Sequence, residues 1–112
     1  MDCIFCRIAK GEVKSNVIYQ DEQAIAFPDI NPKAPVHILI VPRKHIDCVA
    51  DLTEDEEQLM GHLVSIANKL ARENGVAASG FRLAINCGPE GGQIVPHLHI
   101  HLLGGRQLGK LG

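Results

Sequence analysis

The sequence contains no tryptophan, and aromatic residues make up only 4% of it. The core must therefore be mainly aliphatic. The hydrophobic fraction of 46% is typical of a globular protein. A chain of 112 residues fits one domain and leaves little room for a second, so we expect residues 1–112 to form a single domain.

Strong positive charge and long apolar segments are also missing. The formal net charge is −2 and no basic run is present, which argues against a protein that binds nucleic acid by neutralising phosphates. No apolar run approaches the roughly 20 residues that a membrane span needs. The first residues lack the basic and apolar regions of a signal peptide. The sequence therefore predicts a cytoplasmic protein without nucleic-acid or membrane partners.

The apolar pattern predicts two helices and five strands. A short helix is expected over residues 3–10, ended by Gly11, and a long amphipathic helix over 54–74. Thr53 and Glu56 form a capping box at the start of the long helix, and Gly75 suits its end. The predicted strands cover residues 17–19, 24–27, 36–41, 81–86 and 97–103. This order predicts an α+β fold with a five-stranded, mainly antiparallel sheet.

Histidine is abundant by contrast, and three of the six histidines fall within the run His97-Leu98-His99-Ile100-His101. On a strand, alternate side chains point to the same face, so the three imidazoles are expected on one face about 7 Å apart. Three interpretations compete: a solvated strand face, a zinc site built on His-x-His, and nucleophilic catalysis by one histidine supported by the others.

A glycine-rich loop over residues 88–92 comes directly before the histidine strand. Glycines let the backbone approach a ligand closely, and successive amides form an anion-binding concavity. Gln93 adds a side chain that donates and accepts, which would place a phosphate beside His99. A plain turn is the alternative. The sequence holds neither a Walker lysine motif nor an acidic cluster for magnesium-dependent phosphoryl transfer.

The histidine run resembles the HxHxHxx signature of the histidine triad (HIT) family. Further segments are similar to the HINT-like nucleoside phosphoramidase branch of that family: Ala26-Phe27-Pro28-Asp29-Ile30, Pro35-Val36-His37, Pro42-Arg43-Lys44-His45, Gly91-Gly92-Gln93 and Leu103-Gly104-Gly105-Arg106. The resemblance spans nearly the whole chain. It implies a homodimer whose sheet continues across the interface, with the long helix and the 81–86 strand near the junction.

The resemblance also implies binding of AMP- or GMP-type purine nucleotides and hydrolysis of a P–N bond through a nucleotidyl-histidine. His99 is then the nucleophile, supported by His37 and His101, with no catalytic cofactor. Asp29 would bind the ribose hydroxyls. Residues implied for the rest of the nucleotide are Phe5, Ile8, Phe27 and Ile30 around the base, and Asn86, Gly92, Gln93, His99 and His101 near the phosphate or leaving group.

Cys3 and Cys6 form a CxxC pair, while Cys48 and Cys87 stand alone. The pair fits simple core cysteines, a redox pair, or half of a zinc site. No βαβ pattern supports the redox alternative. The resemblance extends to relatives that join CxxC to two histidines, which here are His45 and His97. A Cys2His2 set is a closed structural zinc site, so we expect structural zinc at these four residues.

One position departs from the HINT-like pattern. Ile94 follows Gln93 where a serine or threonine is usual, so a hydroxyl expected near the phosphate or leaving group is missing. His62 lies within the long helix and is expected at a surface or interface. Three competing functions remain open beside phosphoramidate hydrolysis: a dinucleotide polyphosphate hydrolase, a nucleotide-binding regulatory module with little turnover, and a zinc hydrolase that uses the histidine triplet as ligands.

Overall fold

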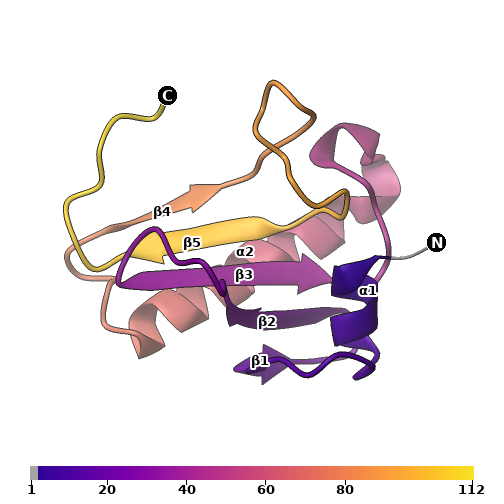
Figure 1. The fold of residues 1–112 in the computed structure, drawn as a ribbon, viewed down its shortest axis with the longest axis horizontal. Helices are drawn as coiled ribbons and strands as arrows, with labels where there is room; N and C mark the ends of the chain where they lie inside the picture. Colours follow the sequence, from indigo (N-terminus) through magenta and orange to yellow (C-terminus); the bar gives the residue numbers. More distant parts are fainter. Residues whose placement is uncertain (1–2) are drawn as a thin grey trace.

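The protein folds into a five-stranded antiparallel sheet with a helix on each face (Figure 1). This computed structural model describes residues 3–112. The strand order is β1-β2-β3-β5-β4. The strands are β1 (Tyr19–Gln20), β2 (Ala24–Pro28), β3 (Val36–Pro42), β4 (Phe81–Ala84) and β5 (Ile100–Gly104). The helices are α1 (Ile4–Ala9) and α2 (Glu57–Glu73), with 3₁₀ turns η1 (Val49–Asp51) and η2 (Glu54–Glu56). The predicted α+β class is confirmed.

The main core lies between the sheet and α2. Leu63, Ile66 and Leu70 of the helix are buried against alternate residues of β3 and β5, including Ile40 and Leu102. Because side chains alternate along a strand, the intervening residues of the same strands face the other way. The aliphatic core predicted from the low aromatic content is therefore present on this face.

The capping box predicted at the start of the long helix is confirmed. The Thr53 amide donates to the Glu56 carboxylate at 2.9 Å, and the Thr53 side chain accepts a backbone hydrogen bond in return. The first turn is 3₁₀ rather than α-helical, so α2 proper begins at Glu57, three residues later than predicted. Gly75 follows the helix with a positive φ of 74°, a conformation that a side chain disfavours.

A second, smaller core lies on the opposite face, beneath α1. Phe5 of this helix packs on Phe27 of β2 with ring centroids 5.6 Å apart, and Leu39 and Val41 of β3 complete the cluster. Arg43 fixes the end of the helix by donating to the Ala9 carbonyl at 2.6 Å. The short helix α1 therefore packs on the face of the sheet that carries the histidines.

Two predicted strands are shorter in the structure. The predicted start at His97 is wrong, because the amides of His97 and Leu98 donate to Val95 and Ile46 instead of to a neighbouring strand, and β5 begins at Ile100. The predicted end of the fourth strand at Asn86 is also wrong. β4 stops at Ala84, which pairs with His101, close to where β5 begins.

The first strand is shifted as well. It was predicted over residues 17–19 but pairs with β2 only at Tyr19 and Gln20, although the Ile18 amide still donates to Ala26 at 2.9 Å. The turn after it is held by Asp21, which also contacts His62 of α2 at 2.6 Å. His62 is thus half-buried in a contact between sheet and helix. Within residues 3–112, no helix is long and apolar enough to cross a membrane.

Candidate active site

A cavity of about 440 Å³ opens between α1, the sheet and the glycine loop. This volume lies within the range of small-molecule binding sites. Most of the residues predicted to bind a ligand line it: Phe5, Ile8, Phe27, Asp29, Ile30, Asn86, Gly92, His99 and His101. Its walls are mainly aliphatic and aromatic, and the histidines form a polar side.

His99 has a defined tautomer. Its Nδ1 lies 2.7 Å from the carbonyl oxygen of His97, and a carbonyl only accepts, so Nδ1 carries the proton. In the neutral ring, Nε2 then holds a free lone pair. The ring is 6% exposed and packs edge-on against Phe5 at 5.1 Å. A fixed imidazole with an unshared nitrogen lone pair at a cavity wall is suited to nucleophilic attack.

His37 and His101 form a hydrogen-bonded pair beside it. His37 of β3 pairs with Leu103 of β5, so His101 is its diagonal neighbour on the same face of the sheet. His37 Nε2 lies 3.0 Å from His101 Nδ1. The backbone amide of Lys33 donates to His37 Nδ1 at 3.0 Å, which leaves the proton of neutral His37 on Nε2. His101 therefore accepts through Nδ1 and carries its own proton on Nε2.

Burial favours the neutral form of both imidazoles of this pair. Burial lowers the pKa of His37 below its usual value, against the opposing effect of Asp29. Burial also lowers the pKa of His101 to about 4, together with repulsion from His99 and His37. His101 thus offers an uncharged N–H donor, and its ring centroid lies 4.8 Å from that of His99.

Asp29 follows β2 and lines the cavity beside this pair. One carboxylate oxygen accepts from the Asn31 amide at 2.9 Å, and the other lies 3.5 Å from His37 Nε2. Its side chain is 20% exposed. Asp29 therefore still has acceptor capacity for a ligand hydroxyl.

The glycine loop is held close to the cavity by its own contacts. Asn86 Nδ2 donates to the Gly91 carbonyl at 2.7 Å. A Cβ at Gly91 would lie 2.2 Å from the Cys87 carbonyl oxygen, so only glycine fits there. Gln93 does not line the cavity. Its side chain bridges neighbouring loops, donating to the carbonyls of Asp47 and Val95 and accepting from the Gly88 amide.

Several lining residues were not singled out from the sequence. Lys14 and Ser15 belong to the irregular segment between α1 and β1, and Lys33 to the proline-rich loop before β3. Segments without a periodic pattern gave no signal that they return to the cavity. In the sequence, Ile94 stands out only as a departure from the family pattern. It lines the cavity and is 92% exposed, which is unusual for isoleucine.

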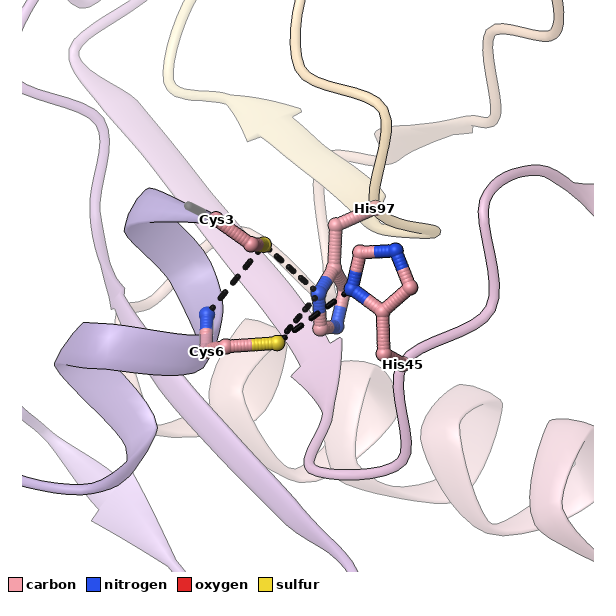
Figure 2. Close-up of side chains that lie close together, drawn as sticks. All are labelled: Cys3, Cys6, His45 and His97. Atoms are coloured by element: carbon pink, nitrogen blue, oxygen red, sulfur yellow. Dashed lines mark hydrogen bonds between the residues drawn. The ribbon is translucent and has the colours of Figure 1, made fainter. Parts of the chain in front are cut away.

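A second cluster forms at the N-terminal end of α1 (Figure 2). Cys3 and Cys6 meet His45, which follows β3, and His97, which precedes β5, with all four ligand atoms within 4.8 Å of one another. Cys3 Sγ and Cys6 Sγ lie 3.2 Å and 3.5 Å from His97 Nδ1, and Cys6 Sγ lies 3.2 Å from His45 Nδ1. In a tetrahedral zinc site with Zn–S near 2.3 Å and Zn–N near 2.0 Å, ligand atoms lie about 3.3–3.8 Å apart. The Cys2His2 donor set and these three contact distances therefore fit zinc.

The outer ring nitrogens of this cluster are already engaged. His97 Nε2 donates to the Pro42 carbonyl at 2.8 Å, and His45 Nε2 lies 2.7 Å from the Asp47 carboxylate. Each contact places the proton on Nε2 and leaves the Nδ1 lone pair facing the sulfur atoms. Metal-binding histidines are usually oriented in this way. The predicted association of the CxxC pair with His45 and His97 is present, which supports a metal site rather than simple packing.

The HIT domain family model matches residues 10–108 of the chain. The chain belongs to the histidine triad (HIT) family. This HIT protein is 44% identical over 110 residues to the purine nucleoside phosphoramidase of Escherichia coli (strain K12), across 98% of the chain and 92% of that relative. The predicted family is therefore confirmed.

Solved structures agree with this membership. A HIT family hydrolase from Legionella pneumophila Philadelphia 1 superposes with a TM-score of 0.95 and 44% identity, covering 96% of each chain. A histidine triad protein from Clostridium difficile gives a TM-score of 0.95 and 47% identity, covering 100% of this chain and 97% of that one. The HIT fold thus spans the whole described chain.

Proposed function

We propose that this HIT protein is a purine nucleoside 5′-phosphoramidate hydrolase. The observation that carries the proposal is the environment of His99, whose Nε2 lone pair is free at the wall of a cavity of about 440 Å³. The name of the Escherichia coli relative, purine nucleoside phosphoramidase, supports the substrate class.

The reaction proceeds in two displacements. His99 Nε2 attacks the phosphorus atom, a P–N(His) bond forms, and the bond from phosphorus to the substrate amine breaks. The amine leaves with a proton taken from solvent, and the water that attacks in the second step returns one. Water then attacks phosphorus, the P–N(His) bond breaks, and the nucleoside monophosphate is released. His101, an uncharged donor through Nε2, stabilises phosphoryl oxygens or the leaving group in both steps.

The nucleotide occupies the cavity with its base against the apolar wall. The purine contacts Phe5, Ile8, Phe27 and Ile30. Asp29 accepts hydrogen bonds from the ribose hydroxyls. Asn86 and Gly92 approach the phosphate. Gln93 acts indirectly in this arrangement, by holding the loop through its contacts with Asp47 and Gly88.

The direct test is a steady-state assay of the purified protein on adenosine phosphoramidate, an adenylated lysine and a diadenosine polyphosphate. The proposal predicts the largest kcat/KM on one of the P–N substrates. A preference for the polyphosphate would instead favour the dinucleotide polyphosphate hydrolase. Binding of AMP without turnover of any of the three would favour a regulatory module.

We also propose that Cys3, Cys6, His45 and His97 bind a structural zinc ion. Burial and the neighbouring Cys3 raise the pKa of the Cys6 thiol, so a cation is needed to hold Cys6 as a thiolate. Four protein ligands leave no position for an activating water. In this role zinc fixes the start of α1 beside the segment that leads into β5. Metal analysis of protein purified without chelators tests its presence.

The proposed assembly is a homodimer with a continuous sheet. β4 is an edge strand, and its outer edge pairs with no other strand among residues 3–112, which supports extension by a second copy. Sedimentation at micromolar concentration tests this, and a species of 12.2 kDa alone would contradict it. The cytoplasmic location stays a prediction from the sequence.

A further inference from the structure

Two cysteines outside the cavity and outside the Cys/His cluster lie against each other. Cys48 is in the loop between β3 and η1, and Cys87 lies between β4 and the glycine loop. Although they are 39 positions apart in sequence, their sulfur atoms are 2.8 Å apart. Both are free thiols, and both are partly exposed, so a small reagent in solvent reaches them.

The segments that carry these thiols are already joined. The Gln93 side chain donates to the carbonyl of Asp47 at 2.6 Å and accepts from the amide of Gly88 at 3.0 Å. Asp47 and Gly88 are the sequence neighbours of Cys48 and Cys87. A covalent bond between the two sulfur atoms would therefore connect two segments that non-covalent contacts already hold together. Little backbone movement is then needed to form the disulfide.

We propose that Cys48 and Cys87 form a redox modification site, at which a hydroperoxide converts the two thiols into a reversible intramolecular disulfide. One thiolate attacks the peroxide and becomes a sulfenic acid, while the peroxide is reduced to an alcohol, or to water for hydrogen peroxide. The sulfur of the second cysteine displaces the hydroxyl of the sulfenic acid, which leaves as water. Overall, two thiols lose two electrons and two protons, and the peroxide gains them.

The surroundings of Cys48 make this reaction a response to sustained oxidant. The hydrogen bond with Cys87 raises the pKa of the Cys48 thiol, and the Asp51 carboxylate, to which Cys48 donates at 3.6 Å, acts in the same direction. A thiol held protonated reacts slowly with peroxide. Attack by Cys48 is therefore slow, which favours bond formation under longer exposure.

The bond would stabilise the fold. It closes a covalent loop that contains α2 and β4, which restricts the unfolded chain. Native disulfides of this kind raise the melting temperature of a domain of this size by roughly 10 °C. Neither cysteine lines the cavity, so the oxidised protein keeps its turnover.

The test uses the full-length protein loaded with zinc and treated with hydrogen peroxide. Trypsin cleaves after Lys44, Lys69, Arg82 and Arg106, so the two cysteines fall on the separate peptides 45–69 and 83–106, while Cys3 and Cys6 share the peptide 1–7. Mass spectrometry without reductant is expected to show peptides 45–69 and 83–106 linked, with the loss of two hydrogen masses. The melting temperature should rise, and a dithiol should reverse both changes.

Cys48→Ser and Cys87→Ser are the matched controls, and each is expected to abolish both the linked peptide and the rise in melting temperature. Sulfinic or sulfonic acid at Cys48 or Cys87 without a linked peptide would overturn the proposal, as would a bond between two protein molecules seen on a non-reducing gel. A linked pair with an unchanged melting temperature would overturn its stabilising role.

Discussion

The carbonyl oxygen of His97 lies 2.7 Å from Nδ1 of His99. The same His97 directs its ring Nδ1 toward Cys3 and Cys6, so one residue belongs to the Cys/His cluster by its side chain and orients His99 by its backbone. Both histidines precede β5, which begins at Ile100. A hydrogen bond therefore links the Cys/His cluster to His99.

Replacement of His99 tests the proposed nucleophile. His99→Ala should lower kcat on a phosphoramidate by several orders of magnitude, since no covalent intermediate can form, and should leave AMP affinity largely intact. Single-turnover kinetics and mass spectrometry of acid-quenched wild-type enzyme would detect the nucleotidyl adduct. His62→Ala is the matched control, because His62 lies outside the cavity and contacts Asp21. Near-normal turnover by His99→Ala would eliminate the mechanism.

Substitution of Ile94 tests the effect of the serine or threonine hydroxyl that this position lacks. The side chain is 92% exposed at the cavity, where it cannot donate to a phosphate oxygen or a leaving group. A hydrogen bond to a charged group contributes about 1.5–3 kcal/mol, so Ile94→Ser should raise kcat/KM roughly tenfold or more on at least one phosphoramidate. Ile94→Val is the control that keeps an apolar side chain. Equal activity of all three proteins on every substrate would show that other donors already perform this task.

The lowered pKa of His101 predicts how stability depends on pH. The folded protein takes up a proton on His101 only near pH 4, whereas the unfolded chain takes it up near the ordinary value of about 6.5. Between these values the unfolded state binds more protons, so stability falls as the pH decreases from about 6.5 to about 4. The melting temperature of His101→Gln should fall less steeply across this range. Parallel curves for the two proteins would contradict the assignment.

The sequence predicted the elements whose patterns are local. The capping box at Thr53 and Glu56 and the amphipathic long helix depend on neighbouring residues, and both are confirmed. Strand ends were less accurate. His97 lies outside the sheet because its amide donates to the Val95 carbonyl rather than to a strand partner. That hydrogen bond depends on the conformation of the surrounding loop.

The candidate site shows the same contrast between local patterns, which the sequence predicts, and long-range contacts, which it does not. The alternation of His99 and His101 placed both on one face correctly, but the pairing of His37 with His101 depends on the register between β3 and β5, which only the folded sheet defines. Family resemblance suggested Gln93 as a direct contact for the phosphate or leaving group. Its amide is instead engaged by three backbone groups across two loops, a long-range arrangement without a sequence signal.

Removal of the proposed zinc is the last test. Two thiolates and two imidazoles would neutralise and saturate the ion, so it should support the fold rather than the chemical step. Binding at a free zinc concentration about 1,000 times Kd contributes about 4 kcal/mol of stability. Cys6→Ser should therefore remove zinc and lower the melting temperature by roughly 20 °C, while the fraction that stays folded keeps a kcat close to that of the wild type. Metal analysis, thermal melts and kinetics on the same preparation separate these effects. If the ion instead activated water, activity would follow metal content while the fold stayed intact. A variant that folds fully, lacks zinc and has lost turnover would therefore overturn the structural role, because the hydrogen bond from His99 to the His97 carbonyl does not itself require a metal.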